Sequence, residues 1–96
     1  MRNLSIVVRM SPTNLTREKY DQVERRLEQA GVWPDPDGME MHVLFGDEGN
    51  LRVSEIWDSR EKLQAFGDTL MPILADEGVG FSGDPEIFEV QNLAKR

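Results

Sequence analysis

The stretch "SEIWDSREKLQAF", residues 54–66, joins the end of a predicted strand to the start of a predicted helix. β-branched and aromatic side chains lead up to Trp57, as is usual in a strand. Asp58 or Ser59 then caps the helix, and Asp58 and Glu61 have the spacing of a capping box. Trp57 therefore stands where the strand passes into the helix, either as a core residue or as one wall of a ligand pocket.

Strand and helix patterns alternate along the rest of the chain. Apolar and β-branched runs predict strands over Leu4–Met10, Met39–Phe45, Leu51–Trp57 and Glu86–Leu93. Helical spacing predicts one helix after Thr16, ending at Gly31, and a second over "SREKLQAFGDTLMPILADEG", in which Pro72 should cause a kink or a restart. The order β-α-β-β-α-β predicts an α+β, ferredoxin-like sandwich. Two helices should cover one face of an antiparallel four-stranded sheet, with the first and third strands at its centre.

Composition restricts the class of protein. The 96 residues predict one domain spanning 1–96, and 39% hydrophobic with 30% charged residues is typical of a globular protein. The absence of cysteine excludes disulfides and thiolate chemistry. A net charge of −7 disfavours nucleic acid and anionic membranes as partners. The N-terminal apolar run is too short for a signal peptide and no stretch approaches a membrane span, so a cytoplasmic location is expected.

The sheet face without helices is also predicted to be apolar. Val7 in the first strand and Ile56 in the third alternate away from the other apolar residues of their strands. A face of this kind needs a cover, and a second subunit is the simplest one. We therefore expect a homodimer in which the two sheets face each other.

The segment "EIWDSREKLQAF" after a hairpin resembles the antibiotic-biosynthesis-monooxygenase-like group of dimeric α/β-barrel proteins. In that group a tryptophan closes the third strand, and a Ser-Arg/Lys-Glu run opens the helix. The resemblance implies a ferredoxin-like fold and a dimeric α/β barrel. It leaves the activity open, because the superfamily holds oxygenases, haem-degrading enzymes, isomerases, cyclases and proteins without known activity.

Two features of that group are missing from this sequence. Its oxygenases pair the strand-end tryptophan with an asparagine a few residues upstream, where this chain has Arg52, Ser54 and Glu55. Its haem-degrading members bind iron through a histidine on the second helix, and the corresponding segment here has none. Of these residues Trp57 alone carries over, and the resemblance predicts no haem and no other cofactor.

Glu55 is the first candidate catalytic residue. Alternation along the third strand places Leu51, Val53 and Trp57 on the same face as Glu55. If the hairpin is centred on its "GDEGN" turn, the face also receives Met39, Met41, Val43 and Phe45. A lone carboxylate among apolar groups can act as a general acid or base. Alternatively, Glu55 reaches the rim and binds Arg9, Arg52 or water.

His42 is the second candidate catalytic residue and the only histidine, opposite Ser54 in that register. One histidine without cysteine does not make a transition-metal site, so no metal is expected. His42 serves either as an acid/base group or as a hydrogen-bonded interface or surface residue. The predicted ligand pocket lies under the second helix, and its residues are Trp57, Met41, Phe66, Leu70 and Met71.

Three functions fit these observations. The first is a cofactor-independent enzyme, of monooxygenase, isomerase or cyclase type, acting on a small hydrophobic or aromatic molecule. The second is a homodimer that binds such a ligand without chemistry. The third is a structural homodimer whose interior is filled by side chains. A cleft of a few hundred Å³ between helices and sheet favours the first two functions.

Overall fold

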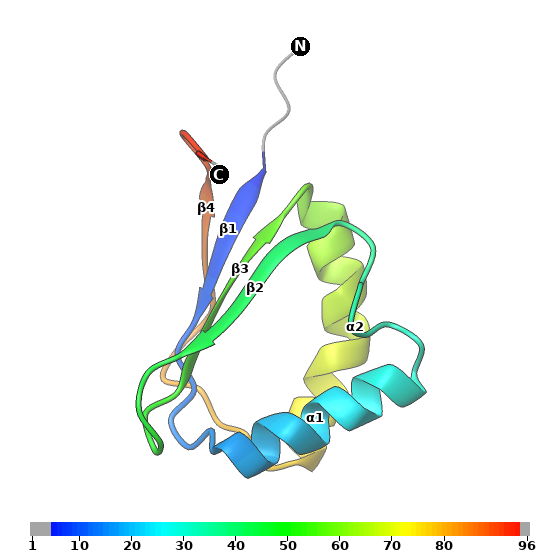
Figure 1. Cartoon of the computed structure of the whole chain (residues 1–96), viewed down its shortest axis with the longest axis vertical. Coiled ribbons are helices and arrows are strands. Elements are labelled where there is room, and N and C mark those ends of the chain that lie inside the picture. Colours follow the sequence, from blue (N-terminus) through cyan, green and yellow to red (C-terminus); the bar gives the residue numbers. More distant parts are fainter. Residues whose placement is uncertain (1–4, 95–96) are drawn as a thin grey trace.

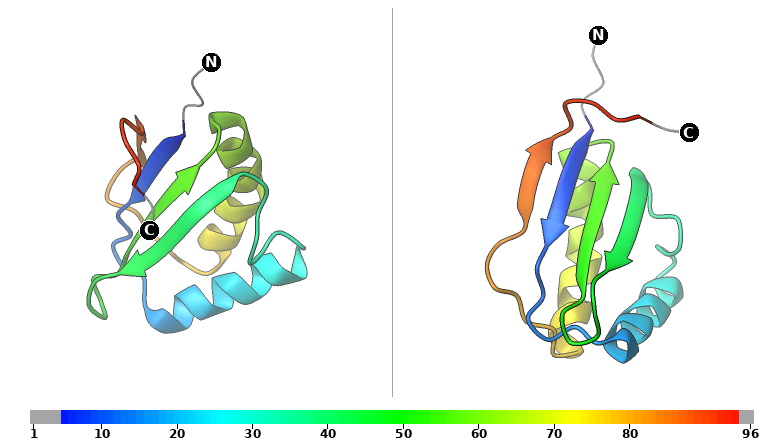
Figure 2. Two further views of the ribbon diagram at one scale, coloured as in Figure 1. Left: turned by 45° about the horizontal axis from the view of Figure 1, so that its top comes forward. Right: turned by 60° about the vertical axis from the view of Figure 1, so that its left-hand side comes forward.

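The computed structural model describes residues 5–94 and shows the predicted order of elements. These are β1 (Ile6–Met10), α1 (Arg17–Gln29), β2 (Met39–Phe45), β3 (Arg52–Trp57), α2 (Arg60–Asp76) and β4 (Glu86–Glu89). The strands form one antiparallel sheet in the order β2-β3-β1-β4, and both helices lie on the same face of it (Figure 1 and Figure 2). The predicted α+β, ferredoxin-like fold is confirmed. Leu4, the predicted start of the first strand, lies outside the described residues.

Side-chain caps fix where the two helices begin. Thr16 accepts a hydrogen bond from the Lys19 amide at the start of α1, and Ser59 accepts one from the Lys62 amide at the start of α2. Of the two predicted caps of α2, Ser59 is therefore the one used. Asp58 binds the Lys62 ammonium instead, with 3.3 Å between Oδ2 and Nζ. The Asp58 and Glu61 spacing does not mark a capping box here.

α2 continues through Pro72 to Asp76, so the predicted restart of the helix is wrong. Proline removes one backbone donor and crowds the preceding turn. Pro72 lies in the last turns of the helix and its side chain is exposed.

The hydrophobic core lies between the helices and the sheet. Its buried members come from every layer: Ile6 and Val8 of β1, Leu51, Val53 and Trp57 at β3, Val23 and Leu27 of α1, Phe66, Ile73 and Leu74 of α2, with Leu15 and Val79 from the connections. The alternation predicted for β3 is confirmed, because its helix-facing residues are buried. Burial of these side chains is the main favourable contribution to folding.

The predicted register between β2 and β3 holds at Met39, which pairs with Trp57, and is wrong by one residue from Met41 to Phe45. Phe45 pairs with Arg52 and His42 pairs with Glu55, and a β-bulge lies between Met39 and Met41. Shifting a strand by one residue transfers every side chain to the other face. The helix-facing residues of β2 are thus His42 and Leu44, together with Met39 before the bulge, which packs against the core as predicted. Met41, Val43 and Phe45, predicted on the helix side, lie on the bare face of the sheet.

The bare face carries an apolar row that crosses all four strands. Met41 pairs with Ile56, Ile56 with Val7, and Val7 with Phe88. Met41 is 43% exposed and Phe88 is 51% exposed. Exposed apolar side chains gathered in this way are typical of an interaction surface.

Candidate functional site

Glu55 is the one buried charged residue of the described chain, with 2% of its surface exposed. It stands in the middle of β3, paired with Val8 of β1 on one side and His42 of β2 on the other. Its side chain points into the layer between sheet and helices. A buried carboxylate is costly unless hydrogen bonds compensate for the lost water.

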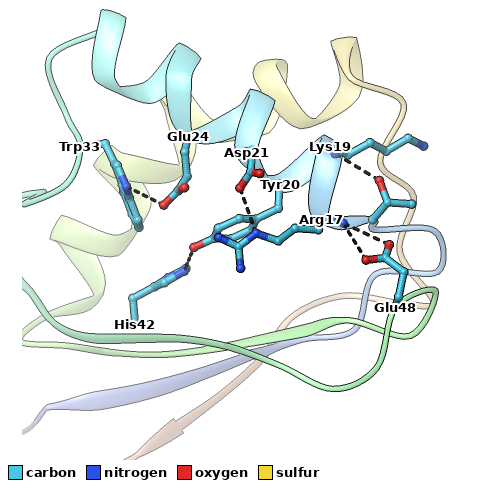
Figure 3. Close-up of polar contacts among 9 residues, drawn as sticks. Arg17, Lys19, Tyr20, Asp21, Glu24, Trp33, His42 and Glu48 are labelled. Carbon is cyan, nitrogen blue, oxygen red and sulfur yellow. Dashed lines mark hydrogen bonds and ion pairs between the residues drawn. The ribbon is translucent and has the colours of Figure 1, made fainter.

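Two donors from the sheet supply those hydrogen bonds. The indole Nε1 of Trp57 donates to Glu55 Oε1 at 2.9 Å. The imidazole Nδ1 of His42 lies 2.7 Å from Glu55 Oε2. On the other side of the ring, His42 Nε2 lies 2.6 Å from the hydroxyl of Tyr20 on α1 (Figure 3). We call these four residues, Trp57, Glu55, His42 and Tyr20, the Glu55–His42 network.

The carboxylate of Glu55 fixes the direction of these bonds, because an ionised carboxylate can only accept. Burial raises the pKa of Tyr20, and the negative charge of Glu24 raises it further. Tyr20 is therefore a neutral phenol. With Glu55 ionised, Nδ1 of a neutral His42 carries the ring proton and donates to Glu55, and Nε2 accepts a hydrogen bond from the Tyr20 hydroxyl. A neutral imidazole oriented by a carboxylate is the arrangement of a general base.

Trp33 closes this site from the loop between α1 and β2. Its indole stands edge-on to the His42 ring, with centroids 4.9 Å apart. Its Nε1 donates to Glu24 Oε2 at 3.0 Å, which ties the loop to α1 (Figure 3). Sequence reasoning did not find Trp33, Glu24 or Tyr20 as site residues. Tyr20 had one usable signal: a tyrosine on the buried stripe of a helix needs a partner for its hydroxyl.

A cavity of about 50 Å³ lies beside the imidazole. We call it the His42 cavity. It is lined by His42, Tyr20, Glu24, Trp33 and Glu55 among the polar and aromatic groups, and by Met10, Pro12, Leu15, Val23, Leu27, Val53, Phe66, Leu70, Leu74, Val79 and Phe81. A water molecule needs roughly 10–15 Å³ on this scale. The His42 cavity therefore has room for a few waters or for the reacting group of a larger molecule.

A larger groove of about 650 Å³ lies between α2 and the β1–β4 half of the sheet. We call it the α2 groove. Its walls are Val8, Met10, Glu55, Arg60, Leu63, Gln64, Phe66, Gly67, Asp68, Leu70, Met71, Pro72, Pro85 and Ile87. Met10, Glu55, Phe66 and Leu70 line both this groove and the His42 cavity. The two spaces therefore adjoin at the carboxylate.

The structure gathers most of the predicted site residues in this region, with two exceptions. Glu55 and His42, the candidate catalytic residues, are in direct contact. Phe66, Leu70 and Met71 line the α2 groove. Met41 does not, because the β-bulge turns it to the bare face.

Trp57 is a core residue, and none of its surface is exposed. Its ring packs on Phe66 with centroids 5.2 Å apart, and it lines neither the α2 groove nor the His42 cavity. Of the two roles that the sequence left open for Trp57, the structure favours the core. Its indole N–H reaches the site through Glu55.

Among residues 5–94, no three His, Cys, Asp or Glu side chains gather closely enough to hold a metal ion. Within the same part of the chain, no helix has the length and apolar character needed to cross a bilayer.

The sequence matches no protein-family model and no curated protein. Solved structures are similar in fold. A candidate antibiotic biosynthesis monooxygenase from Caulobacter crescentus CB15 has a TM-score of 0.56 and 19% identity, over 96% of this chain and 93% of that one. Another from Deinococcus radiodurans has a TM-score of 0.53 and 15% identity, over 95% of each chain. A conserved protein from Methanosarcina mazei Go1 has a TM-score of 0.56 and 14% identity, also over 95% of each chain.

The chain shares the fold of these proteins. The resemblance to antibiotic-biosynthesis-monooxygenase-like proteins is thus confirmed for the fold. At identities of 14–19% it does not transfer the roles of individual residues. Function has to be argued from the Glu55–His42 network and the spaces beside it.

Proposed function

We propose that this chain forms a homodimeric enzyme that needs no cofactor and moves a proton on a small hydrophobic or aromatic molecule. The observation that carries the proposal is the Glu55–His42 network, which places an oriented imidazole beside an apolar cavity. The groups lining the α2 groove and the His42 cavity are mostly aliphatic or aromatic. Sites of this composition suit apolar ligands that are oriented by a few polar groups.

The network can take up a proton in two linked transfers. A substrate O–H, or a C–H next to a carbonyl, gives its proton to the Tyr20 oxygen as Tyr20 passes its own proton to His42 Nε2. The imidazole becomes an imidazolium while Glu55 stays ionised and stabilises the new charge. Return of the proton to another atom of the substrate completes an isomerisation or a cyclisation. The same first step produces the electron-rich anion that a cofactor-independent oxygenase requires.

The position of the two spaces suggests how a ligand would bind. The body of the molecule occupies the α2 groove, which has the volume of a typical small-molecule site. Its reacting group enters the His42 cavity between Phe66 and Leu70, which line both spaces. Met71, at the outer wall of the groove, adapts its shape easily because its side chain is unbranched.

The homodimer is proposed from the apolar row Met41–Ile56–Val7–Phe88. Two such sheets placed face to face bury these side chains and leave both helices outside. The α2 groove, on the opposite face of the sheet, remains open in this arrangement. The fold neighbours named as antibiotic biosynthesis monooxygenases are consistent with the proposal, because the resemblance implies a dimeric α/β barrel.

Deuterium exchange at an enolisable probe tests the proposed chemistry. We expect the wild type to accelerate exchange at C1 of 2-tetralone over buffer, as measured by NMR. His42→Gln should lose the acceleration, and Tyr20→Phe should reduce it by about 10²-fold or more. Arg25→Gln, on the exposed side of α1, is the matched control. Binding of 2-tetralone without faster deuterium exchange would contradict the proposed enzymatic function and favour a non-catalytic ligand-binding protein.

The alternative is a non-catalytic ligand-binding or structural homodimer. One observation favours it: the Glu55–His42 network satisfies its own polar groups, as networks that specify a unique core do. In that case His42→Gln would change stability but no rate. A protein that neither binds 2-tetralone nor exchanges it would favour the structural form of this alternative.

A further inference from the structure

The wall that α2 contributes to the groove runs along the helix from Arg60 to Pro72. Arg60, Leu63, Gln64, Gly67, Leu70 and Met71 lie along one face at helical spacing, and Phe66, Asp68 and Pro72 also line the groove. At a rise of about 1.5 Å per residue, this face is about 16 Å long from Arg60 to Met71. The groove is therefore elongated along the helix, with Arg60 at one end, the polar groups Glu55, Gln64 and Asp68 along it, and mostly apolar groups elsewhere.

Gly67 stands in the middle of this wall. A glycine in a helix interior costs roughly 1 kcal/mol relative to alanine. No packing constraint requires it here, because a Cβ at Gly67 would meet no atom within 4 Å. Its missing side chain leaves open space where a larger residue would narrow the groove.

Arg60 stands at the end of the wall, at the first position of α2. A cation at a helix N-terminus opposes the helix dipole, so helix stability does not explain this arginine. Lys62, in the same turn, is paired with Asp37 and Asp58. Among the residues that the structure describes, none forms an ion pair with Arg60. The side chain of Arg60 is exposed, and within residues 5–94 it is the one cation that lines the groove.

Asp68 gives the groove a direction. It lines the same space two helical turns beyond Arg60, about 12 Å along the axis. Its carboxylate repels an anionic group placed near the middle of the groove, whereas the Arg60 guanidinium and the amides at the start of α2 attract one. A bound anion is therefore favoured at the Arg60 end.

We propose that the α2 groove binds an elongated apolar molecule with one terminal carboxylate, which pairs with Arg60 while the apolar body lies along Leu63, Gly67 and Leu70. This inference rests on the proposed function, for which it names the substrate class. A second copy of the chain is a poorer occupant, because the apolar row on the other sheet face already provides a dimer surface. The length of the groove and its single cation fit an unbranched acid.

Decanoate and decan-1-ol are matched probes, because they share the tail and differ in charge. The wild type should bind decanoate more tightly than decan-1-ol in isothermal titration at low salt. Arg60→Gln should weaken the binding of decanoate at least about fivefold, which is a difference of about 1 kcal/mol in binding free energy. The affinity for decan-1-ol should be unchanged. Gly67→Leu should abolish binding of both probes, because its side chain fills the groove.

Controls separate these effects from folding and general charge. Arg25→Gln removes the same charge from α1 and should leave both affinities unchanged. Ala75→Leu adds side-chain volume on an exposed part of α2 outside the groove. Gly67→Leu should melt at or above the wild-type temperature, since it replaces glycine in a helix.

Several outcomes would overturn the inference. Equal affinities for the two probes, or decanoate binding that survives Gly67→Leu, would show that the site is not the groove with its arginine. A change of oligomeric state in Gly67→Leu would make the groove an interface between copies. The proposed chemistry is tested independently of the substrate class. The His42→Gln variant should bind decanoate with the wild-type affinity and should no longer accelerate deuterium exchange of 2-tetralone. Loss of exchange therefore concerns the reaction, and loss of decanoate selectivity concerns the substrate class.

Discussion

His42 and Glu55 face each other on adjacent strands, with Nδ1 of the imidazole 2.7 Å from Oε2 of the carboxylate. Both side chains project from the sheet at paired positions, so the ladder between β2 and β3 sets their distance. Functional groups mounted on strands are held more precisely than groups on loops.

Removing the carboxylate should destabilise the protein strongly. Glu55→Ala leaves Trp57 Nε1–H and His42 Nδ1–H without an acceptor in the core, and each unsatisfied buried group costs roughly 1–3 kcal/mol. We expect the free energy of unfolding in urea to fall by roughly 2–5 kcal/mol. Glu61→Ala, on the exposed surface of α2, should stay within about 0.5 kcal/mol of the wild type. A small loss in Glu55→Ala would mean that water replaces the carboxylate easily.

Tyr20 should make stability fall with pH above about 10. There the tyrosine of the unfolded chain loses its proton, while folded Tyr20, whose pKa burial raises, keeps it. The unfolded state then binds fewer protons, so the free energy of unfolding decreases as pH rises, by less than about 1.4 kcal/mol per pH unit. Below about pH 10 both states keep the proton, and this contribution does not vary.

Tyr20→Phe isolates this effect. The hydrogen bonds that the Lys62 ammonium donates to Asp58 and Asp37 raise the pKa of Lys62. Lys62 therefore also lowers the free energy of unfolding at high pH, and Tyr20→Phe keeps this contribution. The difference between the two unfolding curves therefore reports Tyr20 alone. Because Tyr20 is the only tyrosine, absorbance near 295 nm follows its ionisation directly. A titration midpoint near pH 10 for Tyr20 in the folded protein would contradict the burial of its hydroxyl.

The sequence predicts the elements well and the contacts between them less well. Alternation of polar and apolar residues is a local signal, and it placed Val53, Glu55 and Trp57 on the correct face of β3. The pairing of β2 with β3 depends on a bulge beside Glu40, a one-residue event without a sequence signature. That bulge is why His42 was expected opposite Ser54 and lies opposite Glu55.

The cover of the site depends on contacts that sequence reasoning could not reach. Tyr20 meets His42 across 22 residues, and Trp33 meets Glu24 by folding the loop back on α1. Neither contact follows from periodicity, because both depend on how α1 crosses the sheet. Alternation along β3 marks Trp57 as a candidate core residue, whereas Trp33 stands in a loop, where no periodicity indicates its contact with His42.

The two tryptophans should therefore differ in fluorescence. In Trp33→Phe the remaining indole, Trp57, is fully buried, so its emission should lie at short wavelength and resist quenching by acrylamide. In Trp57→Phe the remaining Trp33 should be quenched more and should respond to ligands that enter the His42 cavity. Trp57→Phe should also lower the free energy of unfolding by roughly 2–4 kcal/mol, through lost volume and a lost hydrogen bond. Equal quenching in both variants would contradict the placement of Trp57 in the core and of Trp33 beside the His42 cavity.

The dimer surface can be tested by placing a charge within the apolar row. Phe88 lies on the bare face at the β4 edge of the sheet, with 51% of its surface exposed. In Phe88→Glu the carboxylate would lie in a desolvated interface, which costs several kcal/mol per interface. Sedimentation at micromolar concentration should show twice 11.0 kDa for the wild type and a folded monomer for the variant. Glu89→Gln, at the same β4 edge as Phe88, is the control. Phe81→Glu is not suitable as a control, because Phe81 lines the His42 cavity. A wild type that sediments as a monomer would leave the apolar row without the partner proposed for it.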